Sequence, residues 1–352
     1  MREDSLTWGL VIATKDRLEP LKTCVDLALK QSRPPIEVVV ADSSAAWEDH
    51  ARQIGEIVAA HPQVRLVYEQ GVAPSLTMQR NQAVALARAD IVFMIDDDSF
   101  MYPDCAAEVM TVYDADPEKM VAGVQTFPSP HPEGVGVADA KKEMVDVGPM
   151  LDRGGLKGWL LRHVLGAGGD QAFHPYDGAY PDLPLPQAVR GLNVVQVRFF
   201  GGFRMTYRRE YVLQSPFEPL LRYYCPDEDL DASYRISRLG ALVTAQKARA
   251  HHFMSATGRL NRAQVMTLRL LNHALFFRKN IPDLREARRV YRKRMARRFL
   301  SESLKDLVTL ELRLPRLRGV LRAARLAPRI FTLPEAELAS YYPALQEKIV
   351  KG

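Results

Sequence analysis

Residues 91–98 read Ile-Val-Phe-Met-Ile-Asp-Asp-Asp, five apolar residues followed by three aspartates. A short apolar run of this kind is typical of a strand buried on both faces of a parallel sheet. Ligands of such sheets bind at the carboxyl ends of the strands, which is where Asp96, Asp97 and Asp98 lie. Adjacent carboxylates repel one another, and their oxygens suit Mg²⁺ or Mn²⁺. A solvated acidic loop is the alternative, but a metal site accounts better for acids placed directly after a strand.

The sequence before this stretch alternates between strands and helices. Three more apolar runs predict strands over residues 7–13, 36–41 and 64–68. Helical spacing of apolar residues predicts a helix after each strand, over residues 18–31, 45–60 and 74–89. This order indicates βα units and a mostly parallel sheet. Thr14, Asp16, Arg17 and Asp42 follow the first two strands, so we expect them at the same edge as the three aspartates.

The pattern is less regular beyond residue 100. Residues 128–190 are rich in Pro and Gly, and a segment of this length without regular structure is usually functional or partly disordered. Further strands are predicted over 120–127, 193–200 and 241–245. Helices are predicted from about Arg208, over 261–279, and from 283 to 327, the last with leucines on one side at 300, 304, 307, 310 and 314.

Composition limits the class of protein. With 352 residues, of which 47% are hydrophobic, the chain can form a large core without disulfides. Its three cysteines fit no disulfide or zinc pattern, which favours a reducing cytoplasm. The start does not resemble a secretory signal, and no apolar run approaches the 18 or so residues of a membrane span. The net charge of +6 is concentrated near the end, where residues 278–329 hold 17 Lys/Arg against 5 Asp/Glu.

A second acidic group, Pro226-Asp227-Glu228-Asp229-Leu230-Asp231, precedes a predicted helix. Acids favour a helix N-terminus, so capping explains one or two of these carboxylates. A positioned carboxylate is also what a hydroxyl nucleophile needs as general base. From the residues alone, capping and catalysis are equally good explanations.

Five segments, taken in order, resemble the family 2 glycosyltransferases over residues 6–280. They are VIATKDR, EVVVADSS, QRNQAVALARADIVFMIDDDS, FFGGFRMTYRREYV and PDEDLDASYRISRLG. The resemblance implies the GT-A fold, a Rossmann-like α/β fold of nucleotide-diphospho-sugar transferases with a mostly parallel central sheet. We therefore expect a catalytic domain over 1–280, with 128–190 as an irregular insertion near the acceptor, and a basic helical C-terminal extension over 281–352.

The same resemblance implies roles for individual residues. The expected nucleotide-sugar site consists of Thr14, Arg17, Asp42, Arg80, Asp96, Asp97, Gly201 and Gly202. Asp42 matches the carboxylate that binds the nucleotide base, and Arg80 matches a residue near the sugar-phosphate. Gly201 and Gly202 have two explanations, close approach of a sugar or a tight turn.

The metal ligands and the base are implied in the same way. Asp96 and Asp98 match the DxD motif, with Asp98 preferred as the direct ligand of Mn²⁺ or Mg²⁺. His251 or His252 falls where a further metal or phosphate ligand is common; His252 is preferred, and a structural role is nearly as good an explanation. Asp229 matches the catalytic base and Glu228 its acidic neighbour.

The expected reaction is an inverting transfer of a sugar from a nucleotide diphosphate, UDP before GDP or dTDP, to a hydroxyl of a glycan or lipid-linked acceptor, as in polysaccharide biosynthesis. Arg235-Ile-Ser-Arg238-Leu lacks the tryptophan of the processive membrane synthases, which favours single addition. The rivals are a nucleotidyltransferase, disfavoured because the loop after the first strand has no glycine, and a silent sugar-nucleotide-binding scaffold.

The basic C-terminal helices have three explanations. They can lie on an anionic membrane surface, pack on the catalytic domain, or pack on a second subunit. Nucleic acid is not an expected partner, because no recognised module accompanies the charge. The expected location is the cytoplasm, with peripheral contact to the inner face of the membrane as the alternative. The sequence does not indicate an oligomeric state.

Overall fold

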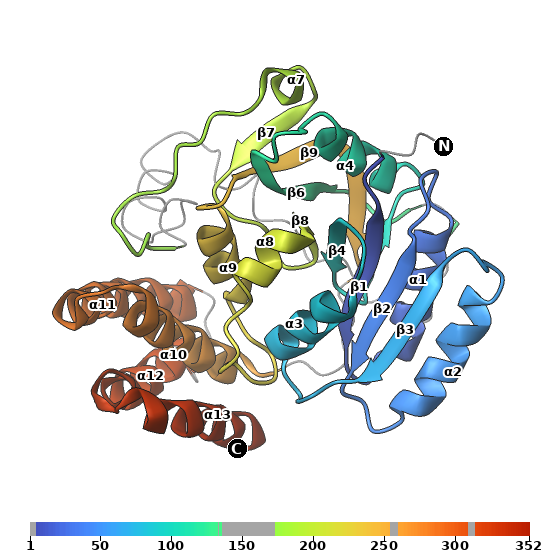
Figure 1. The fold of residues 1–352 in the computed structure, drawn as a ribbon. Coiled ribbons are helices and arrows are strands. Elements are labelled where there is room, and N and C mark those ends of the chain that lie inside the picture. The colour runs from blue at the N-terminus through green and yellow to red at the C-terminus, as the bar shows by residue number, and fades with distance from the viewer. Residues whose placement is uncertain (1–4, 133, 136–172, 254–259, 309–313) are drawn as a thin grey trace. The chain divides into compact units, whose positions relative to one another are not determined.

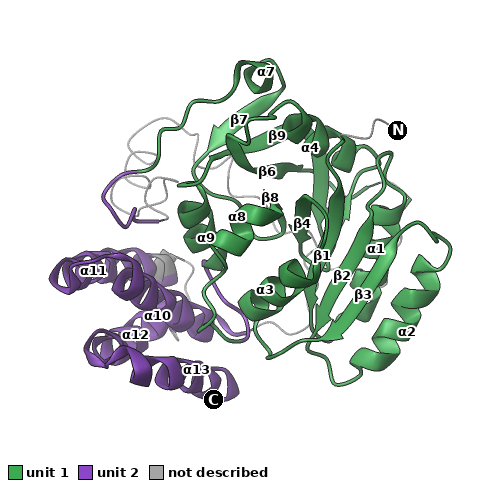
Figure 2. Ribbon diagram, in the orientation of Figure 1, with its two compact units in different colours: residues 1–141, 180–222, 228–258 green, residues 142–179, 223–227, 259–352 purple. Residues whose placement is uncertain are grey.

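The computed structural model describes residues 5–132, 134–135, 173–253, 260–308 and 314–352. The chain forms two compact units (Figure 2). The first contains residues 1–141, 180–222 and 228–258, and the second contains 142–179, 223–227 and 259–352. Much of the Pro- and Gly-rich segment, residues 136–172, lies outside the described residues. The division into domains at residue 280 stays a prediction.

The first unit begins with the predicted strand and helix alternation. Its elements are β1 (Trp8–Thr14), α1 (Leu18–Leu29), β2 (Glu37–Asp42), α2 (Trp47–Val58), β3 (Arg65–Gln70), α3 (Leu76–Leu86) and β4 (Ile91–Ile95). The strands β3, β2, β1 and β4 are parallel neighbours, and Thr14 of β1 pairs with Asp42 of β2. The polar residues that follow these strands therefore share one edge of the sheet, as predicted.

The rest of the unit extends this sheet. Its elements are β5 (Ser99–Met101), α4 (Cys105–Asp114), β6 (Val121–Pro128), α7 (Gln187–Arg190), β7 (Val194–Val197), β8 (Arg204–Arg208), α8 (Arg209–Gln214), α9 (Glu228–Ile236) and β9 (Ala241–His252). The order is β3-β2-β1-β4-β8-β6-β9-β5, with β7 paired to β9. Six strands run in one direction, and only β5, β7 and β8 oppose them. The predicted α/β class with a mostly parallel central sheet is confirmed.

The prediction for residues 193–208 was wrong. The expected strand 193–200 is the shorter β7, and the chain then returns to the sheet as β8 before the helix α8 begins at Arg209. The polar ends of β8 concealed it, because Arg208 lies in the core and is compensated there by Asp116 at 3.0 Å. The strand predicted over 241–245 is also longer, and it reaches His252.

Helices pack on the sheet (Figure 1), and a hydrophobic cluster lies on each of its faces. On one face α1, α2 and α4 contribute buried residues such as Leu21, Ile54 and Val109. On the other face α3, α8 and α9 contribute Ala83, Val212 and Ile236. Both faces are covered, which explains why the central strands are apolar without alternation.

The second unit is helical. It contains α10 (Arg262–Asn280), α11 (Leu284–Val308), α12 (Pro315–Thr332) and α13 (Glu335–Lys351). The stretch 283–327 that was predicted to be helical contains more than one helix, because a new helix starts with Pro315 at its first position. The predicted leucine stripe does not form one helical side, and Leu310 lies outside the described residues. Gly319 lets α12 approach α10 closely, since a Cβ there would lie 2.7 Å from the carbonyl oxygen of Ala263.

No helix in the described ranges combines the length and the apolar character that crossing a bilayer requires.

Candidate active site

The strand register brings the acidic triplet and a histidine together. Asp96, Asp97 and Asp98 form the turn between β4 and β5, and β5 pairs antiparallel with the end of β9. In that pairing Ser99 lies opposite His252, and the backbone N–H of Phe253 donates to the carbonyl of Asp98 at 2.9 Å. His252 is 154 residues from Asp98 in sequence, yet the sheet places it beside that residue.

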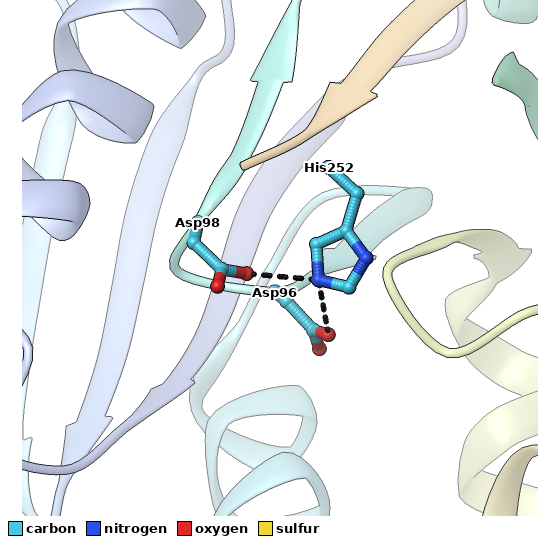
Figure 3. A group of neighbouring side chains, drawn as sticks. All are labelled: Asp96, Asp98 and His252. Atoms are coloured by element: carbon cyan, nitrogen blue, oxygen red, sulfur yellow. Dashed lines mark ion pairs between the residues drawn. The ribbon is translucent and has the colours of Figure 1, made fainter. Parts of the chain in front are cut away.

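Asp96, Asp98 and His252 form a candidate metal site (Figure 3). One ligand atom from each lies within 4.8 Å of the other two, and the Nε2 of His252 is 3.2 Å from the Oδ1 of Asp98 and 3.9 Å from the Oδ2 of Asp96. Burial lowers the pKa of His252, but the two carboxylates outweigh burial and raise it. Two carboxylates and an imidazole are a donor set that suits Mn²⁺, so these residues fit a divalent ion.

His251 points elsewhere. Its Nδ1 lies 3.0 Å from the carbonyl oxygen of Ser129, and its ring stacks on that of His131 at 4.9 Å. Successive side chains of a strand face opposite ways, so only one of the paired histidines can face the acids. The ring of His252 is itself stacked on Phe203, with centroids 4.5 Å apart, which fixes its orientation.

The middle aspartate has different surroundings. The Oδ2 of Asp97 accepts a hydrogen bond from the Thr14 hydroxyl at 2.6 Å, and its Oδ1 lies 3.2 Å from Arg17, which also reaches Asp98 at 3.3 Å. Burial and the neighbouring Asp98 raise the pKa of Asp97 to about 7, although Arg17 and Thr14 act against this. The structure therefore places Thr14 and Arg17 against the acidic triplet.

Arg80 of α3 joins the two acidic motifs. Its guanidinium donates to Glu228 at 2.5 Å, to Asp96 at 2.9 Å and to the carbonyl of Gly202 at 3.0 Å. The residue is 2% exposed. Burial alone would lower the pKa of Arg80, but Glu228, Asp96 and Asp229 outweigh it. The resemblance placed Arg80 near a phosphate; in the structure its hydrogen bonds go to protein groups on both sides of the site.

Glu228 and Asp229 start helix α9 beside this arginine. Burial, together with Asp229 and Asp96, raises the pKa of Glu228 well above its usual value despite Arg80. The Oε2 of Glu228 is buried and has no hydrogen-bond partner in the described part of the chain. Asp229 accepts from the backbone N–H of Gly202 at 2.9 Å and from that of Leu230 at 3.0 Å. Glu228 thus has an oxygen that can accept a further hydrogen bond, and it lies next to Asp229, whose carboxylate is oriented by the backbone.

Gly202 lies close to both acids. A Cβ on this residue would lie 3.4 Å from the Oε1 of Glu228, 3.6 Å from the Oδ2 of Asp229 and 3.7 Å from Arg80. These are ordinary contact distances, and neither Gly201 nor Gly202 has a positive φ. The tight-turn explanation holds as well, because the backbone N–H of Arg204 donates to the carbonyl of Gly201 at 3.2 Å and Gly202 lies within that turn. The missing side chain of Gly202 also keeps space beside the carboxylates.

The other acids of the PDEDLD segment are neutralised by structural partners. Asp227 has a φ of 65° and pairs with Arg269 at 3.1 Å and His273 at 2.8 Å, both from α10. Burial opposes the charge of Asp227, but these partners prevail and lower its pKa. Asp231 pairs with Arg235 one turn along α9, at 2.7 Å. Two of the four acids are thus structural, and Glu228 and Asp229 are the two that face the site.

Asp42 is fully buried at the end of β2. One oxygen accepts from the backbone N–H and the hydroxyl of Ser44, and the other is 2.8 Å from the Nδ1 of His50 and 2.7 Å from the Tyr68 hydroxyl. A carboxylate oxygen accepts about two hydrogen bonds. A nucleotide base can therefore bind Asp42 directly only if one of these donors moves.

Some residues around the site gave no signal in the sequence. Gln79 donates to the carbonyls of Thr14 and Ala41, both at 2.7 Å, and so ties together the ends of β1 and β2. His50 and Tyr68 surround Asp42, and Phe203 supports His252. Gln79 and Phe203 belong to the stretches QRNQ and FFGGF, which lie in segments that carried the family resemblance, although no role was predicted for either residue. His50 and Tyr68 lie outside those segments.

Comparison with known proteins agrees with this arrangement. Residues 10–142 match the family model described as glycosyl transferase family 2. No match was found among curated protein sequences. The solved structure of GalNAc-T7 with UDP, GalNAc and Mn²⁺ is similar in fold, with a TM-score of 0.50 and 13% identity over 82% of this chain and 55% of that one.

Two further solved structures align over nearly the whole chain. A mannosyltransferase from Pyrobaculum calidifontis, PcManGT in complex with GDP-Man and Mn²⁺, has a TM-score of 0.47 and 14% identity over 98% of this chain and 85% of that one. S. aureus TarS 1–349 has a TM-score of 0.48 and 13% identity over 99% of this chain and 92% of that one.

The sheet, the position of the acids at its carboxyl edge and the family match define a nucleotide-sugar transferase domain with the GT-A fold. Residues 10–142 belong to glycosyl transferase family 2, whose enzymes take a sugar from a nucleotide-sugar donor. The family resemblance of the sequence is confirmed.

Proposed function

We propose that this enzyme is an inverting, metal-dependent glycosyltransferase that moves a sugar from a nucleotide diphosphate, UDP in the first instance, to a hydroxyl of a glycan or glycolipid. The observation that carries the proposal is the pair of hydrogen bonds from Arg80 to Asp96 and Glu228. Arg80 therefore connects the acids after β4 with the acids at the start of α9. A reaction that needs both a metal cation and a base requires two such groups of acids in one site.

Asp96, Asp98 and His252 are the proposed ligands of Mn²⁺ or Mg²⁺, with Asp98 the most buried of the three. An ion held by these residues would supply positive charge to offset the negative charge that develops on the leaving nucleotide diphosphate. Both GalNAc-T7 and PcManGT are described with Mn²⁺. Arg17 would neutralise the remaining charge of the triplet, and Thr14 would keep Asp97 turned away from the ion.

Asp229 is the proposed general base. Backbone N–H groups of Gly202 and Leu230 hold its carboxylate in one orientation, and Gly202 adds no side chain in front of it. Asp229 would accept the proton of the acceptor hydroxyl as that oxygen attacks the anomeric carbon from the face opposite the leaving group. A single displacement of this kind inverts the configuration.

Asp42 and Arg80 are proposed to act through other residues. Asp42 would present His50 and Tyr68 to the nucleotide, and Arg80 would keep Glu228 and Asp96 at a fixed separation. Orientation of this kind accounts for a large share of the acceleration in two-substrate reactions.

The test is to compare Asp229→Asn with the unaltered enzyme in a screen of nucleotide sugars with Mn²⁺. We expect Asp229→Asn to bind the nucleotide normally and to lose about 10²–10⁴-fold in the rate of transfer. Asp231→Asn is the matched control, since Asp231 is paired with Arg235 and should not change the rate once the protein is folded. Equal rates for Asp229→Asn and the unaltered enzyme would exclude Asp229 as the base.

A further inference from the structure

A cavity of about 340 Å³ lies between α11 and α12 of the second unit. From α11 it is lined by Arg288, Tyr291, Arg292 and Met295, and from α12 chiefly by Pro328 and Phe331. This volume is at the lower end of the range for sites that bind small molecules or parts of larger ones. The walls are mostly apolar, with the two arginines as the charged groups among them.

Tyr291, which lines the cavity, carries a hydroxyl that the protein leaves unsatisfied. The Tyr291 hydroxyl is buried and has no hydrogen-bond partner among the described residues. Its ring packs against Phe331, with centroids 5.4 Å apart, and burial raises the pKa of the phenol. Buried hydroxyls are nearly always hydrogen-bonded, because a buried donor without an acceptor costs free energy. An acceptor atom of a ligand would satisfy this donor.

The charge at the cavity is not compensated. Arg292 is exposed and forms no ion pair within the described ranges, whereas Arg288 donates to the carbonyl of Phe331 at 2.8 Å. The sequence of α12 has five arginines and no acid. A ligand that fits these walls therefore has an anionic head near Arg292 and an apolar part against Met295 and Phe331.

The surface around the cavity is apolar as well as basic. On α11, residues 284, 288, 295 and 299 follow one another at helical spacing, so Leu284 and Phe299 share a face with the cavity residues. Leu284 is 38% exposed, Phe299 43% and, on α12, Leu321 52%. Exposed large apolar side chains among arginines are typical of helices that lie in the interface of an anionic bilayer. A soluble phosphorylated metabolite would leave these side chains in water.

We propose that the cavity between α11 and α12 binds one anionic phospholipid of a bilayer, with the lipid phosphate at Arg292 and the Tyr291 hydroxyl and the start of an acyl chain against Met295 and Phe331. Leu284, Phe299 and Leu321 insert beside it. This site is separate from the transfer chemistry of the first unit, so it does not depend on the donor or on the metal.

The first experiment is co-sedimentation of the full chain with phosphatidylcholine vesicles, with and without phosphatidylglycerol. We expect binding only to the anionic vesicles. Arg292→Glu should weaken it about tenfold, because a reversed charge at the surface removes attraction and adds repulsion. Lys293→Glu is the matched control: it makes the same charge change on the same helix, at an exposed residue that does not line the cavity. Equal losses in the two variants would show diffuse attraction without a cavity site and would overturn the proposal.

The second experiment uses Tyr291→Phe, which removes only the hydroxyl. We expect unchanged or higher thermal stability, because the buried donor is unsatisfied, together with weaker binding of monomeric dihexanoyl phosphatidylglycerol in calorimetric titration. A fall in stability with unchanged lipid binding would assign the hydroxyl a structural role and contradict the proposal. Inorganic phosphate should bind far more weakly than the short-chain lipid; equal affinity would identify a soluble phosphate site instead and would equally contradict it.

Discussion

Two strand ends of the same sheet carry buried acids in opposite situations. At the end of β2, the oxygens of Asp42 are occupied by Ser44, His50 and Tyr68. At the end of β4, Asp96, Asp97 and Asp98 lie with Glu228 and Asp229, and their basic partners are Arg17, Arg80 and His252. In the first region, the protein itself supplies the hydrogen bonds that the carboxylate needs. In the second region, the acids carry more negative charge than the protein compensates.

This difference separates structural acids from acids that await a ligand. Asp42 and Asp227 are each surrounded by donors from neighbouring elements, and removing those donors should affect folding. In the second region, burial and like charge raise the pKa values of Asp97, after β4, and of Glu228, at the start of α9. Perturbation of this kind is concentrated at functional sites. The following changes, from the largest expected effect to the smallest, test the contrast.

Arg80→Met should be the most damaging change. It leaves Glu228 and Asp96 without their buried cation, and breaking one side of a buried ion pair costs about 3–5 kcal/mol. Urea unfolding of the variant measures this loss. Arg17→Met is the control: Arg17 is partly exposed, so solvent screens its pairs and the loss should be smaller. A larger effect at Arg17 than at Arg80 would contradict the assignment of Arg80 as the link between the motifs.

Acid should destabilise the second unit through His273. Burial first, and then Arg294, lower the pKa of His273 to about 4, although Asp227 acts in the other direction. Between about pH 6.5 and pH 4 the unfolded chain therefore binds a proton at this histidine, whereas the folded chain does not. The free energy of unfolding falls as the pH falls through this window, by about 3 kcal/mol in total.

Unfolding free energies measured from pH 7 to pH 4 test this. His273→Gln has no titrating group at this position and should give a shallower pH dependence over that window. If the two curves had the same slope, His273 would not be the buried neutral histidine that the structure indicates.

Mn²⁺ should stabilise the first unit. An ion that binds only the folded state at 100 times its dissociation constant adds about 2.7 kcal/mol. We expect this gain in thermal unfolding with Mn²⁺, its loss in Asp98→Asn, and its retention in Asp42→Asn. If Asp98→Asn kept the stabilisation by Mn²⁺, the metal site would not be at the end of β4.

Tyr68→Phe should have the smallest effect. It removes one hydrogen bond to Asp42 and leaves the other donors in place, so a loss of about 1 kcal/mol in unfolding free energy is expected. Stabilisation by Mn²⁺ should be unchanged in this variant. If Tyr68→Phe changed the stabilisation by Mn²⁺, the surroundings of Asp42 would not be independent of the metal site at the end of β4.

Local pattern was enough to predict the βα units and the acids at their carboxyl edge, because buried parallel strands are continuously apolar and are followed by polar loops. It could not predict β8, whose buried Arg208 is compensated by Asp116, nor β5 and α4, which follow the acidic turn. It predicted a helical extension over 281–352 but did not separate α11, α12 and α13.

In the site, the acids Asp96, Asp98, Glu228 and Asp229 were named from sequence, as were Arg80 and His252, but the contacts between them were not. Arg80 pairs with Glu228 across 148 positions, and His252 depends on the register of β9 with β5. Strand alternation shows that His251 and His252 face opposite ways; only the register shows which one faces the acids. The donors around Asp42 likewise come from two other elements.

The most direct test of the central claim is calorimetric titration of UDP into the full chain with and without Mn²⁺. We expect UDP to bind only in the presence of the ion, and we expect Asp98→Asn to abolish this dependence together with the binding. If UDP bound equally well without a divalent ion, or if Asp98→Asn left Mn²⁺-dependent binding intact, the acids after β4 would not be the metal site of this enzyme.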